Sequence, residues 1–253
     1  MEDRSTSRRS LAACVGPMPD DPTRRADASH AFKFEVGGLS TSGSWTEANQ
    51  AFAVAAIAHG AGAGLNHPFM AGVAEGLAAG GVSALRFNFP YMDARRRAPD
   101  SLAVLIKTWE VVMRQAADYG HGLPIVAGGK SMGGRMASML AAKQGTKFAG
   151  AALVFFGYPL HAPGRTDDLR DAHLSGIRVP MLFIQGSRDS LARLDLMQAL
   201  VKRLALARLH VVTGGDHSFR VAGVKRSDQE SGRALAEIAI EFIREIMTSH
   251  NPQ

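Results

Sequence analysis

The sequence predicts an α/β fold in which a mostly parallel central sheet is flanked by helices. Short runs rich in Val, Ile, Phe and Ala alternate along the chain with longer stretches whose apolar residues recur at helical spacing. Some of the short runs, above all residues 51–58, are nearly all apolar, which indicates strands that are buried on both faces, as in a parallel sheet. Polar and glycine-rich motifs follow several of these runs, where ligands bind in open parallel sheets.

The predicted strands each end at Gly, Pro or polar residues, which mark turns. These strands span residues 30–36, 51–58, 83–89, 125–128, 153–156, 181–185 and 209–212. The predicted helices carry apolar residues at intervals of three and four. These helices span residues 68–79, 101–119, 132–143, 191–204 and 231–247. We expect no separate cap domain, because the longest excursion, residues 159–175, is too short to form one.

The chain has the size and composition of one globular domain. It has 253 residues, of which 46% are hydrophobic and 21% charged, and a chain of this size can fold around one core. We assign residues 30–250 to this domain. Residues 1–29 are rich in Arg, Ser, Asp and Pro, and we expect them to form a disordered basic tail because they hold few apolar side chains.

The charge, the apolar runs and the cysteine content limit the kinds of partner and the cellular compartment that we expect for this protein. The formal net charge is +6, but the basic residues are scattered without interleaved aromatic residues, so we expect no nucleic-acid partner. Apolar runs such as 51–58 and 149–156 are far shorter than the roughly 20 residues that cross a bilayer, so we expect no membrane association. The single cysteine, Cys14, cannot form an internal disulfide and follows a polar segment without a signal-peptide core. A cytoplasmic location is therefore predicted.

A motif that can carry nucleophilic chemistry lies between a predicted strand and the helix after it. Gly129, Lys130, Ser131, Met132 and Gly133 match the pattern G-x-S-x-G. In this context the serine occupies a strained turn that raises its hydroxyl above the sheet, and the small glycines leave room for strand and helix to approach. The backbone N–H of Met132 would then stabilise an oxyanion. Alone, the pattern also fits a glycine-rich turn before an ordinary helix.

A serine needs a base to accept its proton, and that base needs a carboxylate to orient it. In the fold where this motif occurs the chain order is serine, acid, histidine. Asp189 follows the strand predicted at 181–185, and His217 follows the strand predicted at 209–212. We therefore predict Ser131 as nucleophile, His217 as base and Asp189 as the orienting acid.

Each partner has an alternative interpretation. Asp189 could cap the helix predicted from residue 191, and His217 could be one of 9 histidines on a polar loop. Asp195 and Asp216 are rival acids. We prefer Asp189 because Asp195 lies further into a helix and Asp216 is adjacent to His217, where neighbouring side chains usually point apart.

Further loops at the same strand ends would complete the site. A glycine-rich segment, HGAGAG, follows residue 58, and we predict its Ala61 N–H as the second oxyanion donor, with a flexible loop of no function as the alternative. A small acyl substrate would be bound by apolar walls and a few polar groups. We expect this pocket to be lined by Asn66, His67, Phe69, Phe89, Tyr158 and His161. No metal site and no cofactor are expected, since no H-x-x-x-H or Cys/His cluster accompanies these histidines.

Several stretches together resemble a known superfamily. The segments AHGAGAGLNHPFM, RFNFPYM, GGKSMGGRMAS, FFGYPLHAPG, FIQGSRD and GGDHSF resemble α/β-hydrolases, in particular the small uncapped dienelactone-hydrolase-like branch. Within it they are similar to a bacterial group related to testis-expressed hydrolase-like proteins and to a subunit of a histone-acetyltransferase complex. The likeness covers about residues 30–247. It implies the α/β-hydrolase fold, a Ser131–His217–Asp189 triad and a serine esterase or thioesterase activity.

The resemblance has one departure and leaves one alternative. Dienelactone hydrolases themselves use cysteine as nucleophile, whereas this chain has Ser131 at the motif and its only cysteine in the tail, so dienelactone chemistry is not expected. Relatives that serve in protein complexes suggest an alternative: a catalytically idle fold that binds or scaffolds an acidic partner. Its contact surface would be the basic tail and Arg95–Arg97, although such charges are commonly just solvated. The oligomeric state and the natural substrate are not encoded in these motifs.

Overall fold

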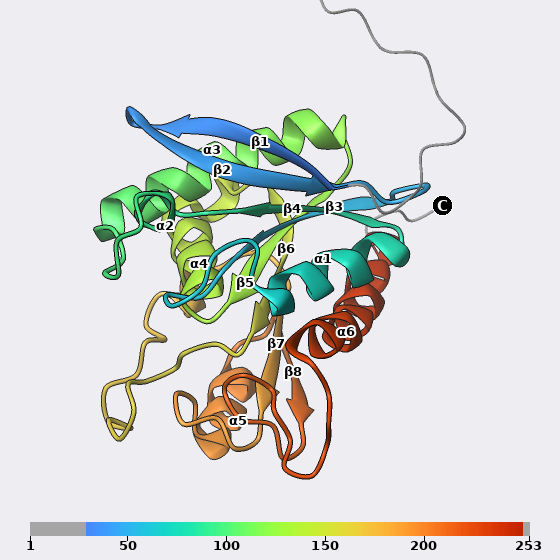
Figure 1. The fold of residues 1–253 in the computed structure, drawn as a ribbon. Helices are drawn as coiled ribbons and strands as arrows, with labels where there is room; N and C mark the ends of the chain where they lie inside the picture. Colours follow the sequence, from blue (N-terminus) through green and yellow to red (C-terminus); the bar gives the residue numbers. More distant parts are fainter. Residues whose placement is uncertain (1–28, 250–253) are drawn as a thin grey trace, which may run out of the picture.

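A computed structural model describes residues 29–249 and contains one eight-stranded sheet with helices on both faces (Figure 1). The strands are β1 Ser29–Val36, β2 Leu39–Thr46, β3 Ala53–Ala58, β4 Val82–Phe87, β5 Ile125–Lys130, β6 Gly150–Phe156, β7 Met181–Gly186 and β8 Ala207–Val212. The α-helices are α1 Pro68–Ala79, α2 Pro90–Asp93, α3 Leu102–Gly120, α4 Met132–Gln144, α5 Leu194–Arg203 and α6 Asp228–Ser249. Short 3-10 turns lie at η1 Gly145–Lys147 and η2 Leu174–Gly176. The predicted fold class is confirmed.

The strand order is β1-β2-β4-β3-β5-β6-β7-β8, and β3 to β8 run parallel. β1 and β2 form an antiparallel hairpin at one edge, drawn in blue at the top of Figure 1. β2 is a strand that the sequence analysis missed, because its sequence LSTSGSWT is polar and lacks an apolar run. Pairing on both sides makes it a strand: β1 on one side and β4 on the other bond its backbone.

Two apolar layers cover the two faces of the sheet. One face packs against α3, α4 and α5, with Trp109, Leu140 and Leu200 buried in that layer. The other face packs against α1 and α6, which lie side by side in Figure 1. A Cβ atom at Gly72 of α1 would lie only 2.0 Å from the Gln229 carbonyl oxygen of α6, so glycine is required where these helices cross.

Several predicted boundaries differ from the observed ones by a few residues. The strand predicted at 83–89 ends at Phe87, since Pro90 begins α2. The helix predicted from 191 begins at Leu194, and the helix predicted from 231 begins at Asp228. Between β6 and β7 the chain forms turns and η2 with no helical cap domain, and the tail predicted for residues 1–29 falls almost wholly outside the described residues. None of the helices between residues 29 and 249 is both long enough and apolar enough to cross a membrane.

Candidate active site

Ser131 lies at a sharp turn between β5 and α4, at the carboxyl end of the sheet. Its backbone has φ 50° and ψ −116°, a strained conformation for a residue with a side chain. A Cβ atom at Gly129 would lie 2.2 Å from the Ala58 carbonyl oxygen, and one at Gly133 would lie 2.5 Å from the carbonyl oxygens of Ala58 and His59. The two motif glycines therefore let this turn lie against the end of β3.

A chain of hydrogen bonds links three side chains from three strand ends. His217 Nε2 lies 2.9 Å from Ser131 Oγ, and His217 Nδ1 lies 2.7 Å from Asp189 Oδ2. Asp189 follows β7 and His217 follows β8, which is the edge strand. The loop after β8 must therefore extend across the ends of β7 and β6 to bring His217 to Ser131, which follows β5. The structure brings together the three residues that the sequence analysis selected.

The carboxylate of Asp189 is fully enclosed and has a partner at each oxygen. Its side chain is 0% exposed; Oδ2 accepts a hydrogen bond from Gln185 Nε2 in addition to His217, and Oδ1 accepts one from the Leu191 amide at 2.8 Å. Asp189 thus also fixes the turn that precedes α5. Sequence reasoning missed Gln185, which is buried at the end of β7 and carries no motif.

The two rival acids have other partners. The Asp195 carboxylate pairs with the Arg193 guanidinium at 2.7 Å and is exposed. The Asp216 carboxylate accepts hydrogen bonds from the backbone amides of Ser218 and Arg220, at 2.8 and 2.9 Å, and so closes the loop that carries His217. Among the described carboxylates, only that of Asp189 lies within ion-pair distance of the His217 ring.

The two predicted oxyanion donors lie beside Ser131, one at the start of α4 and one on the loop after β3. Met132 is the first residue of α4, where backbone N–H groups have no helical acceptor. Ala61 follows Gly60, where an added Cβ atom would lie 3.6 Å from Ser131 Cβ. Within residues 29–249 neither the Ala61 nor the Met132 amide donates a hydrogen bond to another group. Both amides are thus free to bind a negatively charged oxygen.

Buried polar groups hold the loop that carries Ala61. His59 is 0% exposed; its Nδ1 lies 2.7 Å from the Gly60 carbonyl oxygen, and its Nε2 accepts a hydrogen bond from the Phe89 amide at 3.1 Å. Burial lowers the pKa of His59 to about 4, so the ring is neutral at pH 7 and one nitrogen can accept. The Tyr91 hydroxyl donates to the Ala61 carbonyl oxygen at 2.8 Å. Sequence reasoning did not assign these roles to His59 and Tyr91.

Three of the predicted pocket residues lie on loops after β4 and β6 and are buried. Phe89, Tyr158 and His161 are 0%, 1% and 2% exposed. The Tyr158 hydroxyl donates to the Arg170 carbonyl, while the ring nitrogens of His161 bond to Ala162 and Arg193 backbone groups. The side chains of Tyr158 and His161 therefore brace loops, and none of the three offers a free polar group to a ligand.

The other predicted pocket residues lie at the start of α1. Asn66 is exposed, and His67 caps α1 by accepting a hydrogen bond from the Phe69 amide at 3.2 Å. Phe69 is buried and stacks on Phe219 with ring centroids 5.8 Å apart. In the described part of the chain no three His, Cys, Asp or Glu side chains are grouped to hold a metal ion.

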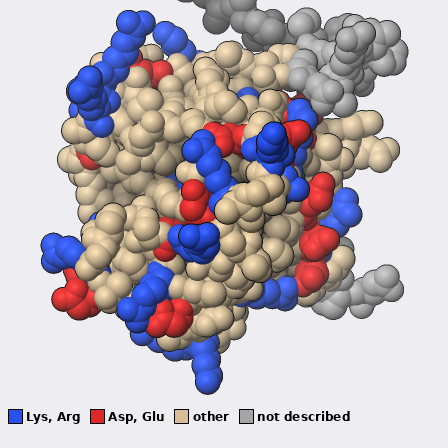
Figure 2. All heavy atoms as spheres, turned by 60° about the horizontal axis from the view of Figure 1, so that its bottom comes forward, with Lys and Arg blue, Asp and Glu red and all other residues tan. Residues whose placement is uncertain are grey.

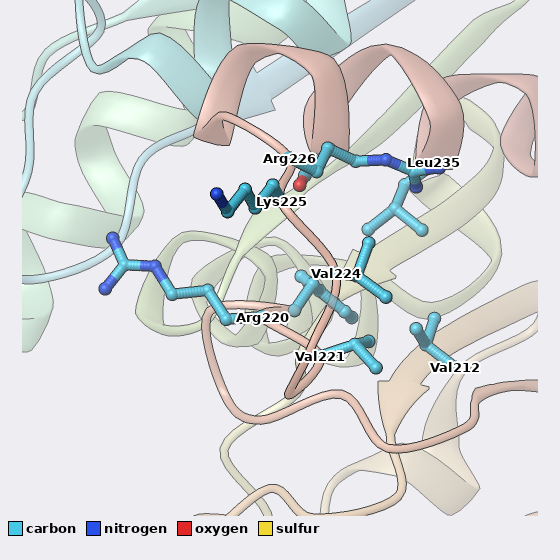
Figure 3. A pocket seen from close by; sticks show the side chains of 9 residues that line it. Val212, Arg220, Val221, Val224, Lys225, Arg226 and Leu235 are labelled. Carbon is cyan, nitrogen blue, oxygen red and sulfur yellow. The ribbon is translucent and has the colours of Figure 1, made fainter.

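A separate cavity of about 200 Å³ lies between the loop after β8 and α6 (Figure 3). In Figure 3 the valine and leucine side chains gather on one side, and Arg220 and Lys225 extend toward the other. Ser131, Asp189 and His217 are not among its lining residues. It therefore adjoins the His217 loop without containing the hydrogen-bonded chain.

Charged side chains are mixed on the face shown in Figure 2, where Lys and Arg groups alternate with Asp and Glu groups over its right and lower parts. Of the arginines at 95–97, Arg96 forms an ion pair with Asp100. This pairing reduces the positive charge that the segment offers to an acidic partner.

Comparisons with known proteins identify the fold. A family model described as an alpha/beta hydrolase domain matches residues 51–247. A dienelactone hydrolase from Anabaena variabilis shares 23% identity with a TM-score of 0.68, covering 87% of this chain and 99% of that chain. An α/β serine hydrolase without a lid from Xanthomonas campestris shares 16% identity with a TM-score of 0.65, covering 87% and 97%. Est1E from Butyrivibrio proteoclasticus shares 16% identity with a TM-score of 0.63, covering 86% and 99%.

The matched family model spans β3 to α6 and includes every strand end that carries the hydrogen-bonded residues. These similarities show the α/β-hydrolase fold. The chain therefore belongs to the alpha/beta hydrolase domain family.

Proposed function

We propose that this protein is a serine hydrolase that cleaves an ester or thioester of a small-molecule acyl substrate. The observation that carries the proposal is the continuous hydrogen-bonded chain from Ser131 through His217 to Asp189, which lies at the carboxyl end of the sheet. A serine, a histidine and an enclosed carboxylate in this arrangement make the hydroxyl nucleophilic, because the base accepts its proton as it attacks.

In the proposed reaction Ser131 Oγ attacks the acyl carbonyl carbon while its proton passes to His217 Nε2. The amides of Ala61 and Met132 bind the oxygen that becomes negative in the tetrahedral intermediate. The intermediate collapses, the bond to the leaving group breaks, and the leaving group takes the proton from His217. Water then attacks the acyl-enzyme with His217 again as base, which releases the acid and restores Ser131. Asp189 orients the imidazole throughout.

The solved structures with this fold support the substrate class. One is described as a dienelactone hydrolase and another as a serine hydrolase, and a ferulic acid complex has been solved for Est1E. A lactone is a cyclic ester, so these descriptions are consistent with acyl chemistry. The lack of a helical cap between β6 and β7 favours substrates that do not require full enclosure.

Labelling with a fluorophosphonate probe tests the nucleophile directly. We expect the wild-type protein to be labelled and Ser131→Ala to be unlabelled. Ser218→Ala is the matched control, since Ser218 is exposed on the His217 loop and its labelling should equal that of the wild type. A wild-type protein that is not labelled, or a Ser131→Ala variant labelled equally, would contradict the proposal and favour a catalytically idle binding role.

A panel of p-nitrophenyl esters of increasing acyl length, together with thioester and amide substrates, tests the substrate class. We expect turnover of esters or thioesters that Ser131→Ala abolishes. Turnover restricted to amides would contradict the proposed class while leaving the nucleophile in place.

A further inference from the structure

Lys130, the last residue of β5, carries an amine that the proposed reaction does not use. Its Nζ donates a hydrogen bond to the backbone carbonyl oxygen of His217 at 2.7 Å, across 87 positions in sequence. No carboxylate of the described residues lies within ion-pair distance of Nζ. The principal partner of this amine is therefore the backbone of the residue that faces Ser131.

The contact between Lys130 and His217 links two strand ends that are not neighbours in the sheet. Ser131 follows β5 and His217 follows β8, and two strands, β6 and β7, separate them. On the β7 side, the Gly214 amide of the His217 loop donates a hydrogen bond to Ser187 Oγ, and the Gly215 carbonyl oxygen accepts one from the Arg188 amide. Lys130 supplies the bond that reaches from this loop to β5 itself. It ties the histidine directly to the strand that carries the serine.

The surroundings of the amine are built to hold it there. The Phe219 ring lies 5.5 Å from Nζ, in the range of a cation–π contact. Gly157 faces it from the loop after β6, with φ 68°, and a Cβ atom there would lie 3.1 Å from Nζ and 3.6 Å from His217 Cε1. A side chain at position 157 would therefore crowd both the amine and the imidazole.

We propose that Lys130 is a positioning residue that holds His217 at its hydrogen-bonding distance from Ser131, an inference that rests on the proposed hydrolase function. A charged donor binds a carbonyl oxygen more strongly than a neutral donor. The hydrogen bond from Lys130 to the His217 carbonyl is therefore strongest while the amine is protonated. When the amine loses its charge, proton transfer from Ser131 to His217 should become slower.

Burial and the nearby charges set the pH at which Lys130 loses its proton. Burial lowers the pKa of Lys130 to about 8, and the nearby charges of Asp189 and Asp216 oppose that shift. Lys130 contacts the titratable residue His217 through the backbone carbonyl of that histidine. The loops after β6 and β3 face Lys130 with Gly157 and Gly60, which carry no charge. The hold should weaken as the pH rises through about 8.

The test is the pH profile of p-nitrophenyl ester hydrolysis by wild-type protein, Lys130→Met and Lys143→Met. Lys143 is the matched control, because it lies on α4 and pairs with Glu110 at the surface. We expect wild-type kcat/KM to fall above pH 8, and Lys130→Met to lose this alkaline limb with kcat reduced by roughly 10- to 100-fold. KM should be unchanged, since Lys130 acts through His217, and Lys143→Met should match the wild type.

A proton NMR measurement separates the failure of this inference from the failure of the proposed function. The proton between His217 Nδ1 and Asp189 should give a far-downfield resonance in wild-type protein and Lys143→Met that is lost or broadened in Lys130→Met. An active wild type with no alkaline limb, or a Lys130→Met variant with unchanged kcat and resonance, would overturn the positioning role alone. A wild type that is neither active nor labelled, with the resonance still sensitive to Lys130→Met, would overturn the hydrolase function and leave the positioning contact.

Discussion

The hydroxyl of Tyr91 donates a hydrogen bond to the carbonyl oxygen of Ala61 at 2.8 Å, across 30 positions in sequence. Tyr91 is fully buried in α2, and burial together with the charge of Asp100 raises its pKa to about 12. The hydroxyl therefore remains a donor throughout the neutral and mildly alkaline range. This bond orients the peptide next to the amide that we propose as an oxyanion donor.

Tyr91→Phe should lower kcat by about 3- to 10-fold, the effect of losing one hydrogen bond of about 1 kcal/mol. Steady-state ester hydrolysis measures it. Tyr119→Phe is the control: Tyr119 stacks on Trp45 with ring centroids 5.1 Å apart, on α3, and its kinetics should match the wild type. Equal kinetics in Tyr91→Phe and wild-type protein would show that Tyr91 does not orient the donor.

Asp189→Asn should reduce kcat by a factor on the order of 10³ to 10⁴, because an amide at this position favours the wrong imidazole tautomer and cannot stabilise its charged form. The same ester assay measures the loss. Asp195→Asn is the matched control, since Asp195 is exposed and pairs with Arg193, and it should retain wild-type kcat. If Asp195→Asn lost as much activity as Asp189→Asn, the assignment of Asp189 as the orienting acid would be wrong.

Gly133→Ala should destabilise the protein by about 1–3 kcal/mol, because its methyl group would lie 2.5 Å from two backbone carbonyl oxygens that end β3. Urea denaturation measures the change. Gly176→Ala provides the comparison: no atom lies within 4 Å of the added Cβ, so its free energy of unfolding should stay equal or rise slightly. Similar stability of the two variants would mean that the contact of α4 with β3 is not tight.

Acid should destabilise the protein through its neutral histidines. Burial lowers the pKa of His59 to about 4, and burial together with the charge of Arg135 lowers that of His173 to about 4, against 6.5 in the unfolded chain. Between these values the unfolded state binds more protons, so the free energy of unfolding falls as pH decreases from 6.5 to 4.

The variant His173→Gln isolates one of these contributions. The stability of the wild type relative to His173→Gln should decline over this range, by at most about 1.4 kcal/mol per pH unit. Urea denaturation at several pH values measures both proteins. A difference that does not vary with pH would contradict a neutral, partly buried His173.

Strongly apolar segments allowed most of the fold to be predicted. Residues 51–58 are nearly all apolar, and β3 lies inside that range with every residue buried. The missed strand, β2, has Ser and Thr at alternate positions, and its backbone is bonded only because β1 and β4 lie on its two sides. An apolar pattern cannot reveal a strand whose stability comes from its neighbours in the sheet.

The candidate site shows the same division. Ser131, Asp189 and His217 were selected because each follows a strand, and the carboxyl ends of parallel strands meet at one edge of the sheet. Phe89, Tyr158 and His161 were expected to line a pocket, but they are buried and those with polar groups bond to backbone. The direction of a loop side chain depends on where its hydrogen-bonding partners lie, and those partners come from distant segments.

The sequence by itself determined most of the strands and helices, the family motif at Ser131 and the strand ends where chemistry could occur, because these depend on local composition and spacing. Only the tertiary structure decided that Asp189 rather than Asp195 meets His217, that Tyr91 holds the Ala61 loop, and that Lys130 bonds the His217 backbone. Each of these contacts joins residues from different elements: two strand-end loops, a helix and a loop, or a strand and a loop. It therefore exists only once the sheet has assembled and set the distances between them.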